Sequence, residues 1–180
     1  MKIIEKKLLF KVKNKKDQDA FGELYDLYVE KIYRFVYFKI SNKEEAEDIT
    51  STVFLKTWQY LIADSKKEVR SFSGLVYQIA RNSIIDFYRW KSTKQECSIE
   101  HIKEISVEDD TYTSIEMDQD VESLMKTLRK LKQEYQEVVM LKHVEELSTA
   151  EVAEILGKSK TNVRVTLHRA TKKLKDLIDQ

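Results

Sequence analysis

The sequence predicts an all-α protein with two small helical domains. Its 180 residues contain no proline and only three glycines, whereas sheets and their turns usually need more of both. Apolar residues recur at helical spacing through most of the chain. This periodicity is lost from Glu96 to Glu122, where there are ten acidic residues and one basic residue. We interpret this stretch as a flexible acidic linker between the two domains.

The first helix that we expect begins near Asp17 or Asp19. One stripe at helical spacing contains its apolar residues: Phe21, Leu24, Tyr25, Tyr28, Ile32, Phe35 and Val36. The segment before it, residues 1–16, has an apolar patch that is too short and too interrupted by charge for a signal peptide. The aromatic density of the helix predicts core packing.

A second helix is expected over about residues 43–61. Ser41 and Asn42 break the preceding pattern, and Asn42 can cap the new helix. Its apolar residues are Ala46, Ile49, Val53, Phe54, Thr57, Trp58 and Leu61. Its first turns carry four acidic residues: Glu44, Glu45, Glu47 and Asp48. They suit the positive end of the helix dipole, but they could equally meet a basic partner.

A third helix should begin near Ser71 and end near Trp90. Its expected buried side consists of Phe72, Leu75, Val76, Ile79, Ala80, Ser83 and Phe87. Another face combines basic, amide and aromatic side chains: Arg81, Asn82, Tyr88, Arg89, Trp90 and Lys91. Such cations can follow phosphates while the rings stack on unpaired bases. Taken alone, the pattern is better explained as an ordinary amphipathic helix.

Two helices are expected after the linker. The fourth helix should begin near Asp118 or Asp120, with these residues inward: Val121, Leu124, Met125, Leu128 and Leu131. The fifth should begin at about Gln133 and bury Tyr135, Val138, Val139, Leu141 and Val144. Together with the segment that follows, they would form a compact C-terminal domain.

Residues 147–174 predict two short helices joined by a tight turn. Ser148 can cap the first helix, and Glu151 completes a capping box. Gly157 can end this helix in the left-handed conformation, and Ser159 can cap the second helix. The apolar residues are Val152, Ala153, Ile155 and Leu156 in the first helix, and Val163, Leu167, Ala170, Leu174 and Leu177 in the second. This is the geometry of a helix-turn-helix, whose second helix enters the DNA major groove.

Charge supports this interpretation. The formal net charge is only +1, but the segment from Gly157 to Lys175 has seven basic residues and no acidic residue. Such a run attracts phosphates. The alternative is a small helical hairpin whose basic face is simply solvated.

Several function classes lack their signatures. The chain has no H-E-x-x-H, paired C-x-x-C, P-loop or G-x-G-x-x-G motif, so we expect no enzyme, no metal site and no cofactor. Cys97 is the only cysteine, which excludes an intramolecular disulfide and fits a reducing cytosol. No apolar run approaches membrane-spanning length. We therefore expect a cytoplasmic protein without membrane insertion.

The order of these segments resembles the bacterial sigma factors of the sigma-70 family, in the small extracytoplasmic-function (ECF) group. AEDITSTVFLKTW, residues 46–58, resembles the family helix that binds core RNA polymerase. FSGLVYQIARNSIIDFYRW, residues 72–90, resembles the segment that melts and reads the minus-ten promoter element. LSTAEVAEILGKSKTNVRVTLHRA, residues 147–170, resembles the reader of the minus-thirty-five element.

The resemblance implies a domain division and three sets of contacts. Residues 1–93 would form a region 2-like domain, 94–120 the linker and 121–180 a region 4-like domain. Contacts to the minus-thirty-five element would come from Lys160, Thr161, Asn162, Arg164, Val165, His168, Arg169 and Lys172. Contacts to the minus-ten element would come from Arg81, Asn82, Asp86, Tyr88 and Arg89, with Asp86 alternatively pairing with Arg89 or positioning the following loop. Core polymerase would be bound by Glu47, Asp48, Ser51, Thr52 and, if it is exposed, Phe54.

The chain departs from the family pattern at four positions. Ser51 and Thr52 stand where the family often has a glutamine followed by an acidic residue, so polymerase binding would depend more on the neighbouring positions. Thr166 and Thr171 stand where the family often has arginines, which affects the promoter sequence that is preferred. The expected partners are core RNA polymerase, promoter DNA and an anti-sigma factor.

The resemblance also gives the linker a path through the nucleic-acid channels of the polymerase. Inside these channels, the carboxylates of the linker could mimic RNA phosphates. Alternatively, they could shield the basic helix in the free protein, or the linker could be a plain solvated tether. The same features admit two other functions for the whole chain. One is a conventional DNA-binding regulator whose N-terminal helices dimerise or bind a ligand, and the other is a protein-binding helical adaptor.

Overall fold

The computed structural model describes residues 2–63, 68–96 and 119–178, and every secondary-structure element in these ranges is a helix. The all-α prediction is therefore confirmed. The chain divides into two compact units, Met1–Glu104 and Ile105–Gln180. Most of the predicted linker, residues 94–120, lies outside the described residues, and so does Cys97.

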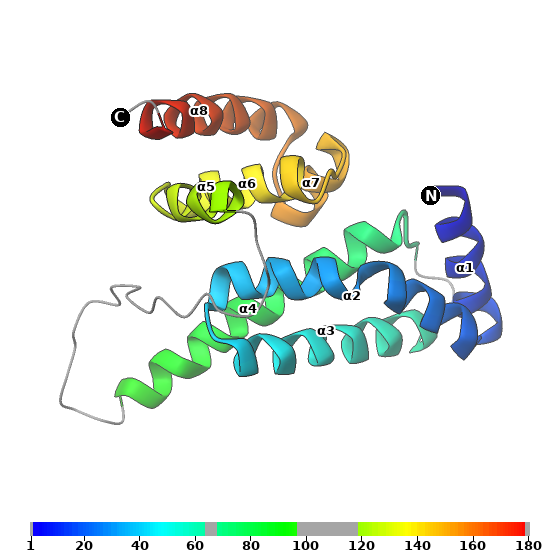
Figure 1. Cartoon of the computed structure of the whole chain (residues 1–180). Helices are drawn as coiled ribbons and strands as arrows, with labels where there is room; N and C mark the ends of the chain where they lie inside the picture. Colours follow the sequence, from blue (N-terminus) through cyan, green and yellow to red (C-terminus); the bar gives the residue numbers. More distant parts are fainter. Residues whose placement is uncertain (1, 64–67, 97–118, 179–180) are drawn as a thin grey trace. The chain divides into compact units, whose positions relative to one another are not determined.

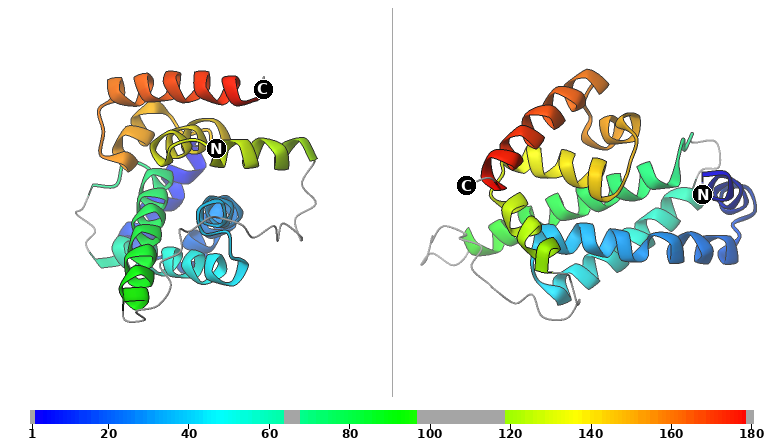
Figure 2. Two further views of the ribbon diagram at one scale, coloured as in Figure 1. Left: turned by 90° about the vertical axis from the view of Figure 1, so that its left-hand side faces the viewer. Right: turned by 45° about the horizontal axis from the view of Figure 1, so that its top comes forward.

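The described residues of unit 1 form four helices. They are α1 (Lys2–Lys15), α2 (Gln18–Ile40), α3 (Lys43–Ala63) and α4 (Phe72–Glu96). The helices α2, α3 and α4 pack against one another along their lengths, while α1 lies at the end of this bundle where α2 and α4 begin (Figures 1 and 2). The ends of α2 and α3 agree with the prediction to within a few residues. Helix α4 continues six residues beyond Trp90, so part of the predicted linker is helical.

Side-chain caps begin the three bundle helices. The side chains of Asp17 and Asn42 each accept a hydrogen bond of 2.9 Å from the backbone N–H three residues further on. Ser71 does the same for the N–H of Gly74 at 3.1 Å. These caps satisfy N–H groups that have no partner within their own helix. The helices therefore begin where the sequence predicted.

The core of unit 1 follows the predicted stripes, with a few differences, of which two concern tyrosines. Tyr77 on α4 is fully buried, with its ring centroid 5.4 Å from that of Phe35, although we had not placed it on the inward stripe. Tyr25 was expected to be buried, but 40% of it is exposed. It lies over Phe54, with 4.6 Å between the ring centroids, and so covers the core from outside.

Helix α1 was not predicted. We expected no element before residue 17, yet Leu8, Leu9 and Val12 are buried against the bundle. The apolar run is short and lysines flank it, so the periodic signal is weak. One buried residue of α1 is acidic: Glu5 is only 7% exposed, and such a position cannot be recognised from hydropathy.

Glu5 joins three helices of unit 1. Its Oε2 accepts a hydrogen bond of 2.6 Å from the hydroxyl of Tyr28 on α2. Its Oε1 accepts from the backbone N–H of Phe72 at 2.9 Å and from that of Ser73 at 3.4 Å. These two amides belong to the first turn of α4, where helical N–H groups lack internal partners and the helix dipole favours a negative charge. The carboxylate of α1 therefore caps α4 across the fold.

Unit 2 contains four α-helices and a π-helical segment among its described residues. They are α5 (Gln119–Arg129), α6 (Gln133–Val139), the π-helical segment η1 (Met140–Val144), α7 (Thr149–Leu156) and α8 (Lys160–Ile178). Helix α8 packs on α5, α6 and α7.

Two details of unit 2 differ from the predictions. Leu124 was expected to point inward, but 43% of it is exposed. The fifth predicted helix begins at Gln133 as expected but changes to π-helical hydrogen bonding at Met140. A spacing rule based on 3.6 residues per turn does not anticipate this change.

We predict that Glu5→Ala lowers the free energy of unfolding by about 2–3 kcal/mol, because it removes the acceptor of the buried Phe72 amide. Thermal unfolding of the full chain, followed by circular dichroism, measures the loss. Glu5→Gln should lose less, since its amide oxygen can still accept one of these hydrogen bonds. Glu23→Ala, at an exposed position on α2, is the matched control, and an equal loss in this control would contradict the capping role.

Candidate nucleic-acid and protein interfaces

The turn between α7 and α8 has the geometry predicted for a helix-turn-helix. Ser148 and Glu151 form a capping box, in which the Ser148 N–H donates to Glu151 Oε2 at 2.9 Å and the Glu151 N–H donates to Ser148 Oγ at 3.3 Å. Gly157 ends α7 with φ 64° and ψ 33° in the left-handed region. Ser159 Oγ accepts from the N–H of Asn162 at 3.1 Å. Each of these local predictions is confirmed.

Helix α8 has a buried side and a basic exposed side. Val163, Thr166 and Ala170 are buried against the rest of unit 2. The residues that we expected at the minus-thirty-five element are all exposed: Lys160, Thr161, Asn162, Arg164, Val165, His168, Arg169 and Lys172. The exposed side is therefore accessible to a ligand along most of the helix.

Thr166 is on the inward side of this helix. Only 6% of it is exposed, and its hydroxyl donates to Asn162 Oδ1 at 3.4 Å. The position where the family often has an arginine is thus an interior position in this chain. The spacing from Val163 and Ala170 could have indicated this, because residues three and four apart share one helix face. Thr171 is exposed, and its hydroxyl donates to the carbonyl of Leu167 at 2.9 Å.

Two lysines connect the helix-turn-helix to the preceding helices. Lys158, in the turn, forms an ion pair with Glu134 at the start of α6. Lys142 of η1 donates to the carbonyl oxygen of Leu147 at 3.0 Å, just before α7. The first contact holds the turn against α6, and the second holds the segment before α7 against η1.

The outer face of α4 carries most of the residues expected at the minus-ten element. Asn82, Asp86, Tyr88 and Arg89 are exposed, while Arg81 is half-buried. The carboxylate of Asp86 lies 3.9 Å from the guanidinium of Arg89, which confirms the pairing of these two residues. Both side chains are largely exposed, so the pair adds little stability.

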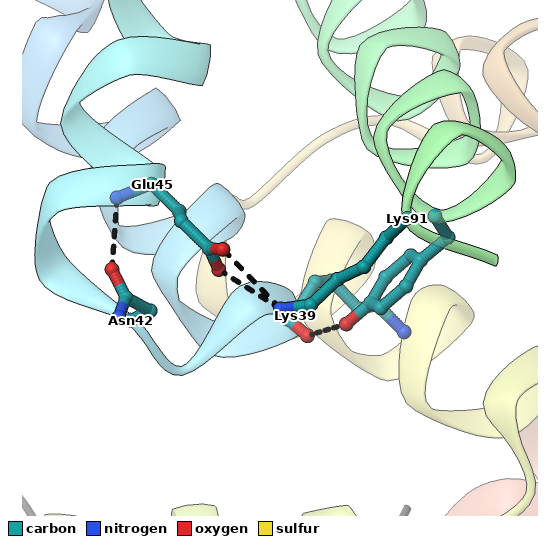
Figure 3. Close-up of polar contacts among 5 residues, drawn as sticks. Lys39, Asn42, Glu45 and Lys91 are labelled. Atoms are coloured by element: carbon teal, nitrogen blue, oxygen red, sulfur yellow. Dashed lines mark hydrogen bonds and ion pairs between the residues drawn. The ribbon is translucent and has the colours of Figure 1, made fainter. Parts of the chain in front are cut away.

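The C-terminal half of α4 is attached to the junction between α2 and α3 (Figure 3). The Tyr88 hydroxyl donates to the carbonyl oxygen of Lys39, at the end of α2, at 2.5 Å. Lys91 Nζ lies 3.2 Å from Glu45 Oε1 at the start of α3, and 5.3 Å from the ring centroid of Phe87. The hydroxyl of Tyr88 is thus used within the fold, and its partly exposed ring is what a ligand can reach.

Trp90 extends the aromatic part of this face. Its ring centroid lies 6.3 Å from that of Phe87, and 54% of the residue is exposed. Phe87 also meets Tyr88, with 5.6 Å between the ring centroids. The outer side of α4 therefore combines exposed aromatic surface with the basic group of Arg89 and the amide of Asn82.

The exposed face of α3 differs from the predicted polymerase-binding set at one residue. Glu47, Asp48, Ser51 and Thr52 are exposed, as that set requires. Phe54 is only 3% exposed, so the condition under which it was assigned to polymerase contact, its exposure, is not met. It packs beneath Tyr25 because it lies on the inward stripe, to which the apolar spacing had also assigned it.

Leu55 is an exposed residue on this face that sequence reasoning missed. It is 57% exposed and lies seven residues after Asp48 and four after Ser51, so the three share one side of α3. The same spacing could have identified it. Together, Asp48, Ser51, Thr52 and Leu55 form a surface that we call the α3 face.

The acidic start of α3 influences one nearby titratable group. Burial raises the pKa of the Tyr33 hydroxyl above its ordinary value, and electrostatic interactions with Glu47 and then with Tyr37 raise this pKa further. The rings of Tyr33 and Tyr37 stack with 5.8 Å between their centroids. Tyr33 is therefore neutral at physiological pH, and the charge of this surface comes from its carboxylates.

The described residues contain neither a cluster of metal-binding side chains nor a membrane-spanning helix. No group of three or more histidine, cysteine, aspartate or glutamate residues in this part of the chain is placed to hold a metal ion. Among the described helices, none is both long enough and apolar enough to cross a membrane.

Comparison with known proteins identifies the family. The family model of sigma-70 region 2 matches residues 24–93, and that of sigma-70 region 4 matches residues 122–174. The ECF RNA polymerase sigma factor SigW of Bacillus subtilis is 32% identical over 98% of this chain and 100% of its own length. The chain is an ECF sigma factor of the sigma-70 family. Such proteins direct the initiation of transcription and are regulators that bind DNA.

Other relatives agree with this assignment. The present chain is 31% identical to the ECF sigma factor BldN of Streptomyces coelicolor. The match covers 90% of the present chain and 61% of the length of BldN. Among solved structures, the present chain is similar to RpoE of Bartonella quintana in complex with the anti-sigma factor NepR. That match has a TM-score of 0.68 and 21% identity, and covers 88% of this chain and 96% of RpoE.

A second structural match is CnrH in complex with the cytosolic domain of CnrY. It has a TM-score of 0.66 and 21% identity, and covers 99% of this chain and 96% of CnrH. At this level of identity, both structural matches establish the fold.

We predict that Gly157→Ala lowers the free energy of unfolding of the sigma factor by about 1 kcal/mol, because an alanine is strained at this positive φ. Gly22→Ala is the contrasting control. Gly22 lies inside α2 with nothing within 4 Å of an added Cβ, so alanine should stabilise the helix by about 0.5–1 kcal/mol. Urea unfolding measures both changes, and equal signs would contradict the assignment of the turn.

Proposed function

We propose that this sigma factor binds core RNA polymerase and brings it to promoters by recognising the minus-thirty-five and minus-ten elements. The region 2-like domain would comprise residues 1–93, the linker 94–120 and the region 4-like domain 121–180. The observation that carries the proposal is the exposed basic side of α8, the second helix of a well-formed helix-turn-helix within the segment matched by the region 4 model.

The minus-thirty-five element is assigned to α8. In a helix-turn-helix, the N-terminal part of the second helix approaches the base edges in the major groove. Lys160, Thr161 and Asn162 lie there, and Arg164 follows one turn later on the exposed side. An arginine can donate two parallel hydrogen bonds to a guanine, so Arg164 is the residue that we assign to base recognition.

Further along α8, one apolar side chain can contact a base and three other side chains suit contact with the DNA backbone. Val165 offers an exposed apolar surface for a thymine methyl group, and His168 can reach a phosphate. Arg169 and Lys172 supply charge that neutralises phosphates in any sequence. Base recognition and phosphate neutralisation are thus assigned to different residues of one helix.

The minus-ten element is assigned to the outer face of α4. Opening a duplex costs a few kcal/mol for each base that is unstacked, and stacking on protein rings together with phosphate contacts must offset this cost. Tyr88 and Trp90 provide exposed rings, and Arg81, Asn82 and Arg89 provide donors. The attachment of α4 through Lys91 and Tyr88, described above, supports this role because it holds the face rigid.

Core polymerase is assigned to the α3 face and the adjacent Glu47. The carboxylates of Glu47 and Asp48 would steer the sigma factor toward a basic surface of the polymerase. Ser51 and Thr52 can donate hydrogen bonds, and Leu55 takes the place of Phe54 as the apolar contact. Catalysis of RNA synthesis would belong to the polymerase.

An anti-sigma factor is a further proposed partner, and the cytoplasm is the proposed location. The similar proteins RpoE and CnrH were each solved in complex with another protein, NepR or the cytosolic domain of CnrY. Purification of the tagged sigma factor from its own cells would test for such a partner.

In-vitro transcription tests the main proposal. Purified core polymerase is combined with fragmented genomic DNA, with and without the sigma factor, and the 5′ ends of the transcripts are sequenced. The proposal is supported if transcripts that share a sequence pattern at their start sites appear only when the sigma factor is present. DNA binding without such transcripts would favour a conventional regulator, and neither activity would favour an adaptor.

We predict that Arg164→Ala and Lys172→Ala weaken promoter binding in different ways. The first should reduce discrimination at one base position by about 1–3 kcal/mol, which is a factor of about 5 to 150. The second should weaken binding to all sequences alike and lower the salt dependence. Holoenzyme binding to a library of the identified promoters distinguishes the two, and a uniform loss with Arg164→Ala would contradict its role in base recognition.

We predict that Leu55→Ser weakens binding to core polymerase by about 1 kcal/mol or more, which is a factor of about five. The measurement is surface plasmon resonance on immobilised core polymerase. Leu27→Ser is the matched control, because Leu27 is also an exposed leucine of unit 1 but lies on α2. If both variants bind like the parent, the α3 face has no apolar contact at Leu55.

A further inference from the structure

A hollow of about 480 Å³ lies within unit 2, between the turn that joins α5 to α6 and the C-terminal half of α8. Leu131 and Tyr135 form part of its wall. The rest consists of five basic residues and one acidic residue: Lys130, Lys132, Arg169, Lys172, Lys173 and Asp176. We call this hollow the basic pocket.

Within the part of the chain that the structure describes, no ion pair balances the charges of the basic pocket. None of its six charged side chains forms a hydrogen bond or an ion pair with another described residue, and that includes the single carboxylate. Five positive charges therefore share one concave surface with one negative charge. Cations held this close repel one another, and an anion placed among them would relieve that repulsion.

The turn that carries two of these lysines is held in place by the fold. Leu131, between Lys130 and Lys132, is 5% exposed. Gln136 Nε2 donates to the carbonyl oxygens of Arg129 at 2.9 Å and of Leu131 at 2.8 Å. Because the turn and α8 are both attached to the core of unit 2, the pocket does not have to be assembled when a ligand arrives.

We propose that the basic pocket binds phosphate groups. Lysine is a compact point charge and arginine a planar fork of donors, and both are common in phosphate recognition. The phosphates could belong to the DNA backbone beside the minus-thirty-five element or to a free polyphosphate. The DNA source rests on the proposed function, because Arg169 and Lys172 line the pocket and also belong to the proposed DNA-binding side of α8.

Lys130 and Lys132 are the residues that this inference adds. They lie on a different element from α8, and no sequence motif drew attention to them. If DNA supplies the phosphates, these lysines extend the contact beyond the recognition helix to a neighbouring stretch of backbone. Asp176 would oppose any anion in the pocket, so its removal should strengthen binding.

The test uses the full chain and two probes: a labelled short DNA duplex of random sequence, and inorganic tripolyphosphate. A random duplex is suitable because backbone contacts do not depend on sequence. The charge-removing variant is Lys130→Gln/Lys132→Gln. Its matched control is Lys6→Gln/Lys7→Gln, which removes the same charge from exposed positions on α1. Asp176→Asn is the variant expected to act in the opposite direction.

If DNA supplies the phosphates, the slope of log affinity against log salt should become shallower by about 1.8 in Lys130→Gln/Lys132→Gln, since each lost phosphate contact accounts for about 0.9. The control should keep the slope of the parent, and Asp176→Asn should bind the duplex more tightly. If a free polyphosphate is the ligand, titration calorimetry should show that tripolyphosphate binds the parent and that the double lysine variant loses this binding.

The inference is overturned if the double lysine variant matches its control with both probes. This result is distinguishable from failure of the proposed function, which in-vitro transcription by the parent protein tests separately. If transcription is normal but the lysines affect binding of neither probe, only the phosphate-binding role of the pocket is rejected. If transcription fails but tripolyphosphate still binds and this binding depends on the lysines, the proposed function is rejected and the phosphate-binding role of the pocket is kept.

Discussion

The carboxylate of Glu5 is the contact on which the arrangement of unit 1 depends. It accepts hydrogen bonds from the hydroxyl of Tyr28 on α2 and from the first two backbone N–H groups of α4, so one side chain joins α1, α2 and α4. A buried carboxylate is costly unless it is hydrogen-bonded, and unpaired amides at a buried helix start are costly as well. Here the carboxylate of Glu5 and the N–H groups at the start of α4 supply each other's hydrogen-bonding partners. Glu5 thereby fixes the start of α4, the helix that carries Asn82 and Arg89.

The two units present their charges in different ways. On α4, Arg89 lies close to Asp86 and Lys91 to Glu45, so part of the charge is balanced within the protein and the exposed rings stand out. On α8, the exposed cations have no acidic neighbour on their own helix before Asp176. A surface of the second kind binds phosphates strongly and loses that binding as salt rises. A surface of the first kind is suited to stacking, which salt affects less.

Local sequence signals were sufficient wherever a few neighbouring residues decide the structure. The caps at Asp17 and Asn42, the capping box at Ser148 and the left-handed Gly157 all confirm predictions, because each depends on contacts within about four residues. The exposed side of α8 was predictable for the same reason. Helix α1 was not, since its burial depends on a surface formed by distant helices and on Glu5, whose polar partners compensate for its charge.

The sequence by itself determined the helical class and the helix-turn-helix, which follow from spacing along the chain, and the family, which follows from the resemblance of three motifs. Tertiary structure decided which residues at the flanks of the helices are accessible. Phe54 and Leu55 are adjacent apolar residues, yet α2 covers the first and leaves the second exposed. The basic pocket is also a product of folding, because about 40 residues of chain separate its two walls. Helical periodicity gives the direction of a side chain but not the position of the neighbouring helix that covers it.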